Sequence, residues 1–294
     1  MKSLALALLS ALGLTLGLGL GPAHAASPLK LVAAENFYGG VAQQIGGTQV
    51  EVVSVLSNPD QDPHLFETSP GVLRDVAAAQ IVVYNGADYD PWMPKLLAAT
   101  PKPDRAEIVA ADLVHKKPGD NPHLWYDPVT MPAVARAIAA ALAKADPAHA
   151  ADYQARLASF LSSLKPIDDK VAAIRKKFAG ASVTASEPVF GYMAEALGLK
   201  MRNEKFQLSI MNDTEPAASD VAAFENDLKG HKVRAMFFNK QASDKIVQHL
   251  VTLARANKVP VVGVTETIPP GMTFQDWMLS ELGDTEKALA GPNS

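Results

Sequence analysis

The stretch MPAVARAIAAALAKADPAHAADYQARLASFLSSLKPIDDKVAAIRKKFAG, residues 131–180, decides the organisation of the chain because helix-forming residues fill nearly all of it. Asp146-Pro147 is a helix start, so the stretch contains at least two helices. The second would run from about residue 147 to 178 and span up to roughly 45 Å. Pro166 falls inside it and should kink or break it. The stretch is therefore either a small helical bundle or a helix that connects two lobes.

Strands and helices alternate on both sides of this stretch, which is typical of α/β lobes with mainly parallel sheets. Strands are expected at 29–37, 48–57, 80–86 and 106–111, and again at 181–187, 200–209, 232–240 and 259–266. Ser69 is a good N-cap and Pro70 a good first helical residue, so a helix should begin there. We predict an α/β fold in which two lobes are joined by a long connecting helix. The predicted ranges are 26–145 for the N-terminal lobe, 146–179 for the connecting helix and 180–294 for the C-terminal lobe.

Residues 1–25 have the features of a secretory signal peptide: Lys2, then an apolar run, then the small-residue site Ala23-His24-Ala25. A membrane anchor is the alternative, but the small-residue end and the lack of a basic flank favour cleavage. The sequence has no cysteine, which excludes a lipidated cysteine and any disulfide. We therefore expect an exported protein stabilised by its core. A net charge of −4 without a basic run argues against nucleic acid as a partner.

Several catalytic signatures are absent from the sequence: the Gly-x-Ser-x-Gly elbow, the Walker loop, the dinucleotide glycine motif and His-Glu-x-x-His. Polar residues instead stand near the carboxyl ends of predicted strands, where open α/β sheets bind ligands. His64, Glu187 and Glu266 each follow or end such a strand, and His123 lies just before the helical stretch. Two imidazoles and two carboxylates are suitable ligands for zinc, manganese or iron.

Both histidines stand in an Asx-Pro-His-Leu setting, in which proline stiffens the loop and lowers the entropy lost when the imidazole is fixed. Each of the four residues also has an ordinary structural interpretation. A loop histidine is usually solvated, Glu187 could be a carboxylate at a helix N-terminus, and Glu266 could be an exposed loop acid. The residues alone leave both interpretations open.

Longer motifs resemble those of the zinc/manganese family of solute-binding proteins, the metal-binding subunits of bacterial ABC importers. DPHLFETSPGVLRDVAAAQIVVYNGADYDPWMPKLL is similar to the first histidine signature of that family, and NPHLWYDP to its second. SEPVFGYMAEALGL resembles the segment that supplies the third ligand. The C-terminal lobe also resembles that of the family, so the resemblance covers nearly the whole chain after the signal peptide.

The resemblance implies two α/β lobes joined by one long helix, with the metal between them. Carried over residue by residue, the implied ligands are His64, His123, Glu187 and Glu266. TETIPPG, which contains Glu266, departs from the family's aspartate-serine pair, and Pro166 within the linker helix is a second departure. The His-rich loop of many zinc-specific members is also missing.

The implied function is capture of Zn²⁺ or Mn²⁺ in the periplasm and delivery to an ABC permease and its ATPase at the inner membrane. We expect a monomer that is not an enzyme. Asp62, Asn121 or Asp127 could orient the imidazoles. Two alternatives remain: an exported zinc-dependent hydrolase, which would need an open coordination position for water, and an organic-solute binding protein, which would present aromatic stacking residues.

Overall fold

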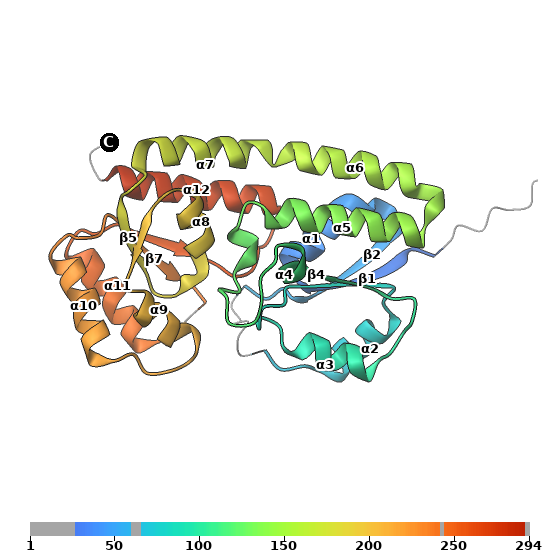
Figure 1. The fold of residues 1–294 in the computed structure, drawn as a ribbon, viewed down its shortest axis with the longest axis horizontal. Helices are drawn as coiled ribbons and strands as arrows, with labels where there is room; N and C mark the ends of the chain where they lie inside the picture. Colours follow the sequence, from blue (N-terminus) through green and yellow to red (C-terminus); the bar gives the residue numbers. More distant parts are fainter. Residues whose placement is uncertain (1–26, 60–65, 242–243, 292–294) are drawn as a thin grey trace, which may run out of the picture.

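The computed structural model describes residues 27–59, 66–241 and 244–291, and these form two parallel four-stranded sheets. The first sheet has the order β2-β1-β3-β4, with β1 (Leu29–Glu35), β2 (Val50–Leu56), β3 (Ile81–Tyr84) and β4 (Ala106–Val109). The second has the order β6-β5-β7-β8, with β5 (Ser182–Ala185), β6 (Lys200–Arg202), β7 (Met236–Asn239) and β8 (Val261–Val264). The predicted α/β fold class is confirmed, with one sheet in each of two lobes (Figure 1). The predicted signal peptide lies outside the described residues.

Helices cover both sheets, as parallel strands require. The N-terminal lobe contains α1 (Asn36–Gly46), η1 (Gly47–Gln49), α2 (Pro70–Ala78), α3 (Trp92–Ala99), α4 (Ala110–Leu113) and η3 (Leu124–Tyr126). The C-terminal lobe contains η5 (Pro188–Phe190), α8 (Gly191–Ala196), α9 (Glu204–Met211), α10 (Ala218–Lys229), α11 (Lys245–Ala256) and α12 (Phe274–Ala290). The predicted start of α2 is confirmed, because the Ser69 hydroxyl accepts from the Val72 amide and Pro70 opens the helix.

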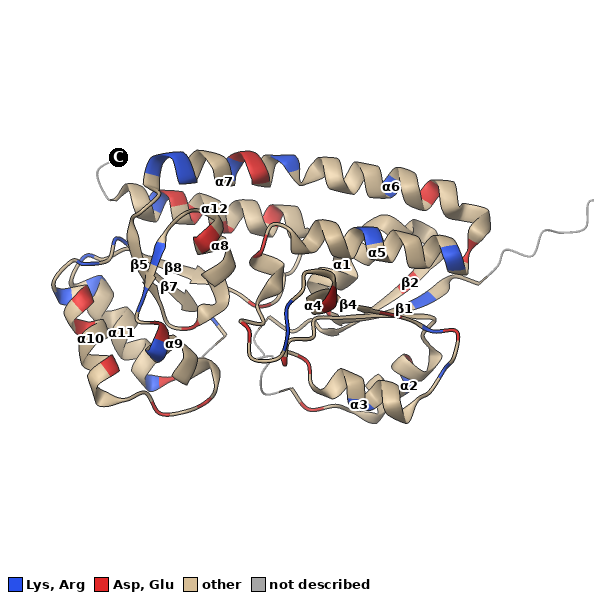
Figure 2. Cartoon of the chain, in the orientation of Figure 1, with Lys and Arg blue, Asp and Glu red and all other residues tan. Residues whose placement is uncertain are grey.

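The middle stretch forms α5 (Thr130–Ala145), η4 (Pro147–His149), α6 (Ala150–Ser163) and α7 (Lys165–Phe178), which run along one side of both lobes (Figure 1). The expected single helix is broken at Leu164, two residues before Pro166, as the missing amide of proline predicts. The halves have different neighbours: α6 packs on α5 and α1, whereas α7 packs on α12. Lys170 and Lys177 of α7 form ion pairs with Glu286 of α12, and Figure 2 shows charged segments along both helices.

One hydrophobic core extends through both lobes. The Phe37 ring of α1 lies 4.5 Å from Trp125 and 6.2 Å from Trp277 of α12, measured between ring centroids. Tyr126 continues this cluster to Phe190 of the C-terminal lobe at 5.3 Å. These aromatic side chains are all buried. Each lobe therefore completes its core with side chains of the other.

One predicted strand is wrong beyond its first residues. The range 200–209 was expected to be a strand, but β6 ends at Arg202 and α9 begins at Glu204. Asn203 lies between them with φ of 61°, a left-handed conformation that asparagine tolerates well. Phe206 and Ile210 are buried four residues apart on the helix. Within residues 27–59, 66–241 and 244–291, no helix combines the length and apolar character needed to cross a bilayer.

Candidate metal site between the lobes

His123 lies in the loop before η3 and is completely buried. Asn121 fixes it twice, because its side-chain oxygen accepts from the His123 amide at 3.1 Å and lies 2.7 Å from Nδ1 of the ring. The amide nitrogen of Asn121 donates to the Pro188 carbonyl at 2.8 Å, so the oxygen is the atom that faces the imidazole. Nδ1 must then carry the proton of a neutral ring. Nε2 lies 3.4 Å from Oε2 of Glu266.

Glu266 follows β8 and is also fully buried. Three residues fix it: Tyr89 donates its hydroxyl to Oε2 at 2.9 Å, Asn239 donates to Oε1 at 2.6 Å, and Gln241 accepts from its backbone amide at 2.6 Å. Tyr89 belongs to the N-terminal lobe and the other two to the C-terminal lobe. Glu266, where the sequence departs from the family's pattern, is therefore a buried carboxylate at the lobe interface and not an exposed loop acid.

Glu187 stands two residues after β5 with 6% of its surface exposed. Its Oε2 accepts from Nδ2 of Asn239 at 2.9 Å. The same amide thus bridges Glu187 and Glu266, and Oδ1 of Asn239 accepts from the Gln241 amide at 3.0 Å. Asn239, the last residue of β7, was not among the residues predicted from the sequence to form the site. A signal was present: it is a polar residue at the carboxyl end of a buried strand, as Glu187 and Glu266 are.

The structure therefore brings three of the four predicted ligands together, around Asn239 and across the lobe interface. His64 lies outside the described residues, as does Asp62. Within the described residues, no group of three or more His, Cys, Asp and Glu side chains is placed to hold a metal ion. Of the residues expected to orient the imidazoles, Asn121 does so, whereas Asp127 accepts from the Val129 amide at 3.2 Å. His115, His231 and His249 are exposed and His149 is half-buried, away from the lobe interface.

A second group of buried acids supports the His123 loop from within the N-terminal lobe. Asp90 accepts from the backbone amides of Asn85 and Gly86 at 2.6 and 2.9 Å. Asn85 in turn donates to the carbonyl of Pro122, the residue before His123, at 2.8 Å. Burial raises the pKa of Asp90 to about 6. Burial and the neighbouring Asp90 hold the pKa of Glu35 well above its ordinary value.

Glu281 of α12 links the two lobes behind Glu266. Its carboxylate accepts from the Tyr126 hydroxyl at 2.6 Å, from the Trp277 indole at 2.9 Å and from the Thr265 amide at 3.2 Å. Burial raises the pKa of Glu281 to about 7, although these hydrogen bonds oppose the shift. Tyr126 lies three residues after His123, and Thr265 precedes Glu266. One buried carboxyl group therefore fixes the segments that carry both of these predicted ligands.

Comparisons with known proteins agree with the fold and its motifs. A family model described as "Zinc-uptake complex component A periplasmic" matches residues 31–288. The manganese-binding lipoprotein MntA of Bacillus subtilis (strain 168) is 26% identical over 275 residues, which cover 90% of this chain and 85% of that protein. The high-affinity zinc uptake system protein ZnuA of the same organism is 23% identical over 221 residues, or 68% of this chain and 67% of that protein.

Solved structures are similar over almost the whole described chain. The periplasmic zinc binding protein TroA from Treponema pallidum superposes with a TM-score of 0.74 at 18% identity, covering 90% of this chain and 99% of that one. A Mn-bound periplasmic metal binding protein from Candidatus Liberibacter asiaticus gives 0.71 at 19% identity, covering 89% and 99%. At these identities the similarity shows a common fold.

Proposed function

This chain belongs to the ZnuA family of periplasmic zinc-uptake components, and from that premise we propose that His64, His123, Glu187 and Glu266 hold one divalent transition metal ion. The family consists of metal-binding components of ABC importers, so the chain is a binding protein and not a hydrolase. Family membership also argues against an organic solute as cargo. The cargo is Zn²⁺ or Mn²⁺, which are the ions named for its relatives.

The observation that carries this assignment is the 3.4 Å between Nε2 of His123 and Oε2 of Glu266. Because Asn121 takes the Nδ1 proton, the Nε2 lone pair of the neutral ring is directed at a carboxylate oxygen. A metal cation placed between the two atoms would be bound by both. Zinc–ligand distances of about 2.1 Å at a tetrahedral angle place neighbouring ligand atoms about 3.4 Å apart. The pair is therefore spaced as two ligands of one ion would be.

His64 completes the set in our proposal. Its loop leaves the carboxyl end of β2, the same edge of the sheet from which the other N-terminal contacts arise. The far end of the loop is held where Phe66 packs on Trp92, with ring centroids 4.8 Å apart, and where Ser69 caps α2.

Two imidazoles and two carboxylates balance the charge of a dication, and they do not by themselves select one metal. Carboxylate oxygens suit Mn²⁺, whereas the Irving–Williams order gives Zn²⁺ the higher affinity at most such sites. We propose that the loaded protein, as a periplasmic monomer, docks on an ABC permease with its ATPase. Release then requires displacement of ligands that come from both lobes.

Metal titration of the purified chain tests the proposal. Chelator-stripped protein is titrated with Zn²⁺ and with Mn²⁺ while its melting temperature is followed, because an ion that binds only the folded state must raise it. His123→Ala, Glu187→Ala, Glu266→Ala and His64→Ala should each reduce this rise. His231→Ala removes an exposed histidine outside the site and is the matched control. No rise with either ion, or an equal loss in the control, would contradict the assignment.

A further inference from the structure

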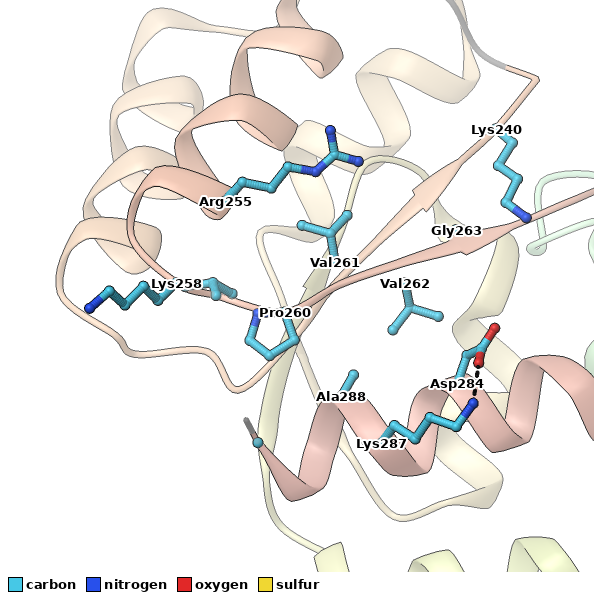
Figure 3. Close-up of a pocket in the computed structure, with 12 residues that line it drawn as sticks. Lys240, Arg255, Lys258, Pro260, Val261, Val262, Gly263, Asp284, Lys287 and Ala288 are labelled. Carbon is cyan, nitrogen blue, oxygen red and sulfur yellow. Dashed lines mark hydrogen bonds and ion pairs between the residues drawn. The ribbon is translucent and has the colours of Figure 1, made fainter. Parts of the chain in front are cut away.

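A cleft of about 890 Å³ opens on the C-terminal lobe between the ends of α11 and α12 (Figure 3). Its floor is the edge of β8 together with Pro260. The cleft extends along β8 from Lys258, which precedes the strand, whereas Glu266 follows the strand at its other end. It is thus a separate feature of the lobe, and the proposed metal capture does not use it.

The backbone of β8 faces this cleft with one row of hydrogen-bonding groups. β8 is the outer strand of its sheet. The amides of Met236 and Lys240 donate to the carbonyls of Pro260 and Val264, at 2.9 and 3.0 Å. Because successive residues of a strand present their backbone groups to opposite sides, those of Val261 and Gly263 point away from β7. In the part of the chain that the structure describes, no strand pairs with this side of β8.

Positive charge surrounds the exposed edge. Lys240, Arg255, Lys258 and Lys287 line the cleft, in a chain whose net charge is −4. Among the described residues that line it, Asp284 is the one carboxylate, and it is paired with Lys287 at 3.0 Å. The stem of Lys240 lies across the strand, because a Cβ on Gly263 would come within 2.4 Å of its Cε. Arg255 lies on the α11 side and Lys287 on the α12 side of β8 (Figure 3).

We propose that this cleft docks an extended, acidic segment of a partner polypeptide, which adds to the sheet as a strand next to β8. The outward groups of Val261 and Gly263 supply the hydrogen bonds of strand addition. The cations supply the charge complementarity and select an acidic segment. They also disfavour a second copy of this chain on the same edge, because two such edges would bring like charges together.

Lysines at a strand edge often serve only to prevent aggregation, and the two roles make different predictions. A purely protective edge repels every incoming strand. A docking edge binds one class of strand, and its affinity depends on the outward backbone groups as well as on the charges. An experiment must therefore vary the charge and the backbone separately.

The probes are two fluorescein-labelled ten-residue peptides, one of Glu, Thr and Val and one with Lys in place of each Glu, followed by fluorescence anisotropy with the full chain. We expect the acidic peptide alone to bind, more weakly as salt is raised. Arg255→Glu combined with Lys287→Glu should weaken binding at least tenfold. Lys95→Glu combined with Lys144→Glu changes the net charge equally on the N-terminal lobe, and should leave binding as it is.

Val261→Pro tests the backbone. Proline removes the outward amide of this edge residue, together with the Val261 side chain that packs on the core of the lobe, and leaves the carbonyls that pair with β7 in place. Binding should weaken in this variant, and the amides of Val261 and Gly263 in the unmodified chain should exchange more slowly when the acidic peptide is bound. An unchanged metal-induced rise in melting temperature verifies the fold of every variant. Equal binding of both peptides, equal loss in the two charge variants, or full binding by Val261→Pro would overturn the proposal.

Discussion

Asn239→Leu should lower both the stability of the protein and its affinity for metal, because the amide at this position donates to both predicted carboxylate ligands. The bonds measure 2.9 Å to Glu187 and 2.6 Å to Glu266, and Asn239 is 2% exposed. A hydrogen bond to a charged group contributes about 1.5–3 kcal/mol, so two give a loss of about 3 kcal/mol at the lower end of that range. The melting temperature of the metal-free protein should fall by about 6–12 °C.

The loss of metal affinity has a geometric cause. Asn239 holds Oε1 of Glu266, which leaves Oε2 directed at Nε2 of His123. Without the amide this orientation is no longer imposed, and loss of such supporting contacts typically lowers metal affinity about 10- to 100-fold. Competition with a fluorescent zinc chelator measures the change. Asn257→Leu, in which a half-buried asparagine directly after α11 loses one bond to the Leu253 carbonyl, is the control. Wild-type affinity in Asn239→Leu would refute the reasoning.

Three further predictions concern stability. With its pKa raised to about 7, the carboxyl group of Glu281 is protonated between about pH 4.5 and 7 in the folded chain but not in the unfolded one. The free energy of unfolding should therefore fall as pH rises through this range, and in Glu281→Gln this fall should be smaller by about 3 kcal/mol. Urea unfolding across the range measures the difference. Glu286 forms ion pairs with Lys170 and Lys177 at the surface, and these lower its pKa to about 2. The stabilisation that these pairs give to the folded chain is therefore present above pH 4.5 and is lost as pH falls toward 2. Glu286→Gln should cost about 1 kcal/mol at neutral pH and less at high salt; unfolding at two ionic strengths measures this, and an equal loss at both would contradict it. Gly46→Ala should destabilise the protein by about 1–3 kcal/mol, because the added Cβ would lie 2.6 Å from Cβ of Val50. Gly283→Ala has open space around the added Cβ and should stabilise the protein by about 0.5–1 kcal/mol. Thermal melts that gave the opposite order of stability would contradict this prediction.

Local patterns were sufficient to predict most of the architecture. The buried strands are short apolar runs, and the start of α2 follows from the cap chemistry of Ser69-Pro70. Pro166 predicted the interruption between α6 and α7 for a reason that is independent of tertiary structure. The predictions for Glu187 and Glu266 followed the rule that ligands gather at the carboxyl ends of parallel strands, whereas His123 was singled out by its Asx-Pro-His-Leu setting and by the family resemblance. The structure places His123 beside Glu266 and joins both glutamates through Asn239.

Local patterns failed where a partner distant in sequence decides the outcome. The segment 203–211 has mixed polarity, and it is a helix because Phe206 and Ile210 pack into the core of the second lobe. Asn239 and Tyr89 look like ordinary polar residues until β7 and the N-terminal lobe are placed beside Glu266. Glu35 ends a largely apolar strand, and only the fold shows that its carboxyl group is buried beside Asp90. A pattern of alternating apolar and polar residues does not encode such contacts between residues that are distant in the sequence.

The contact between the first and last helices also bears on how the chain is made. Trp277 of α12 packs against Phe37 of α1, although the two residues are far apart in the sequence. The aromatic core of the N-terminal lobe therefore remains incomplete until α12 packs against α1. Contacts so distant in sequence slow folding, because a long loop must close before they stabilise anything. The protein should accordingly acquire its native state in one late, cooperative step, and chains truncated before α12 should be targets for proteolysis.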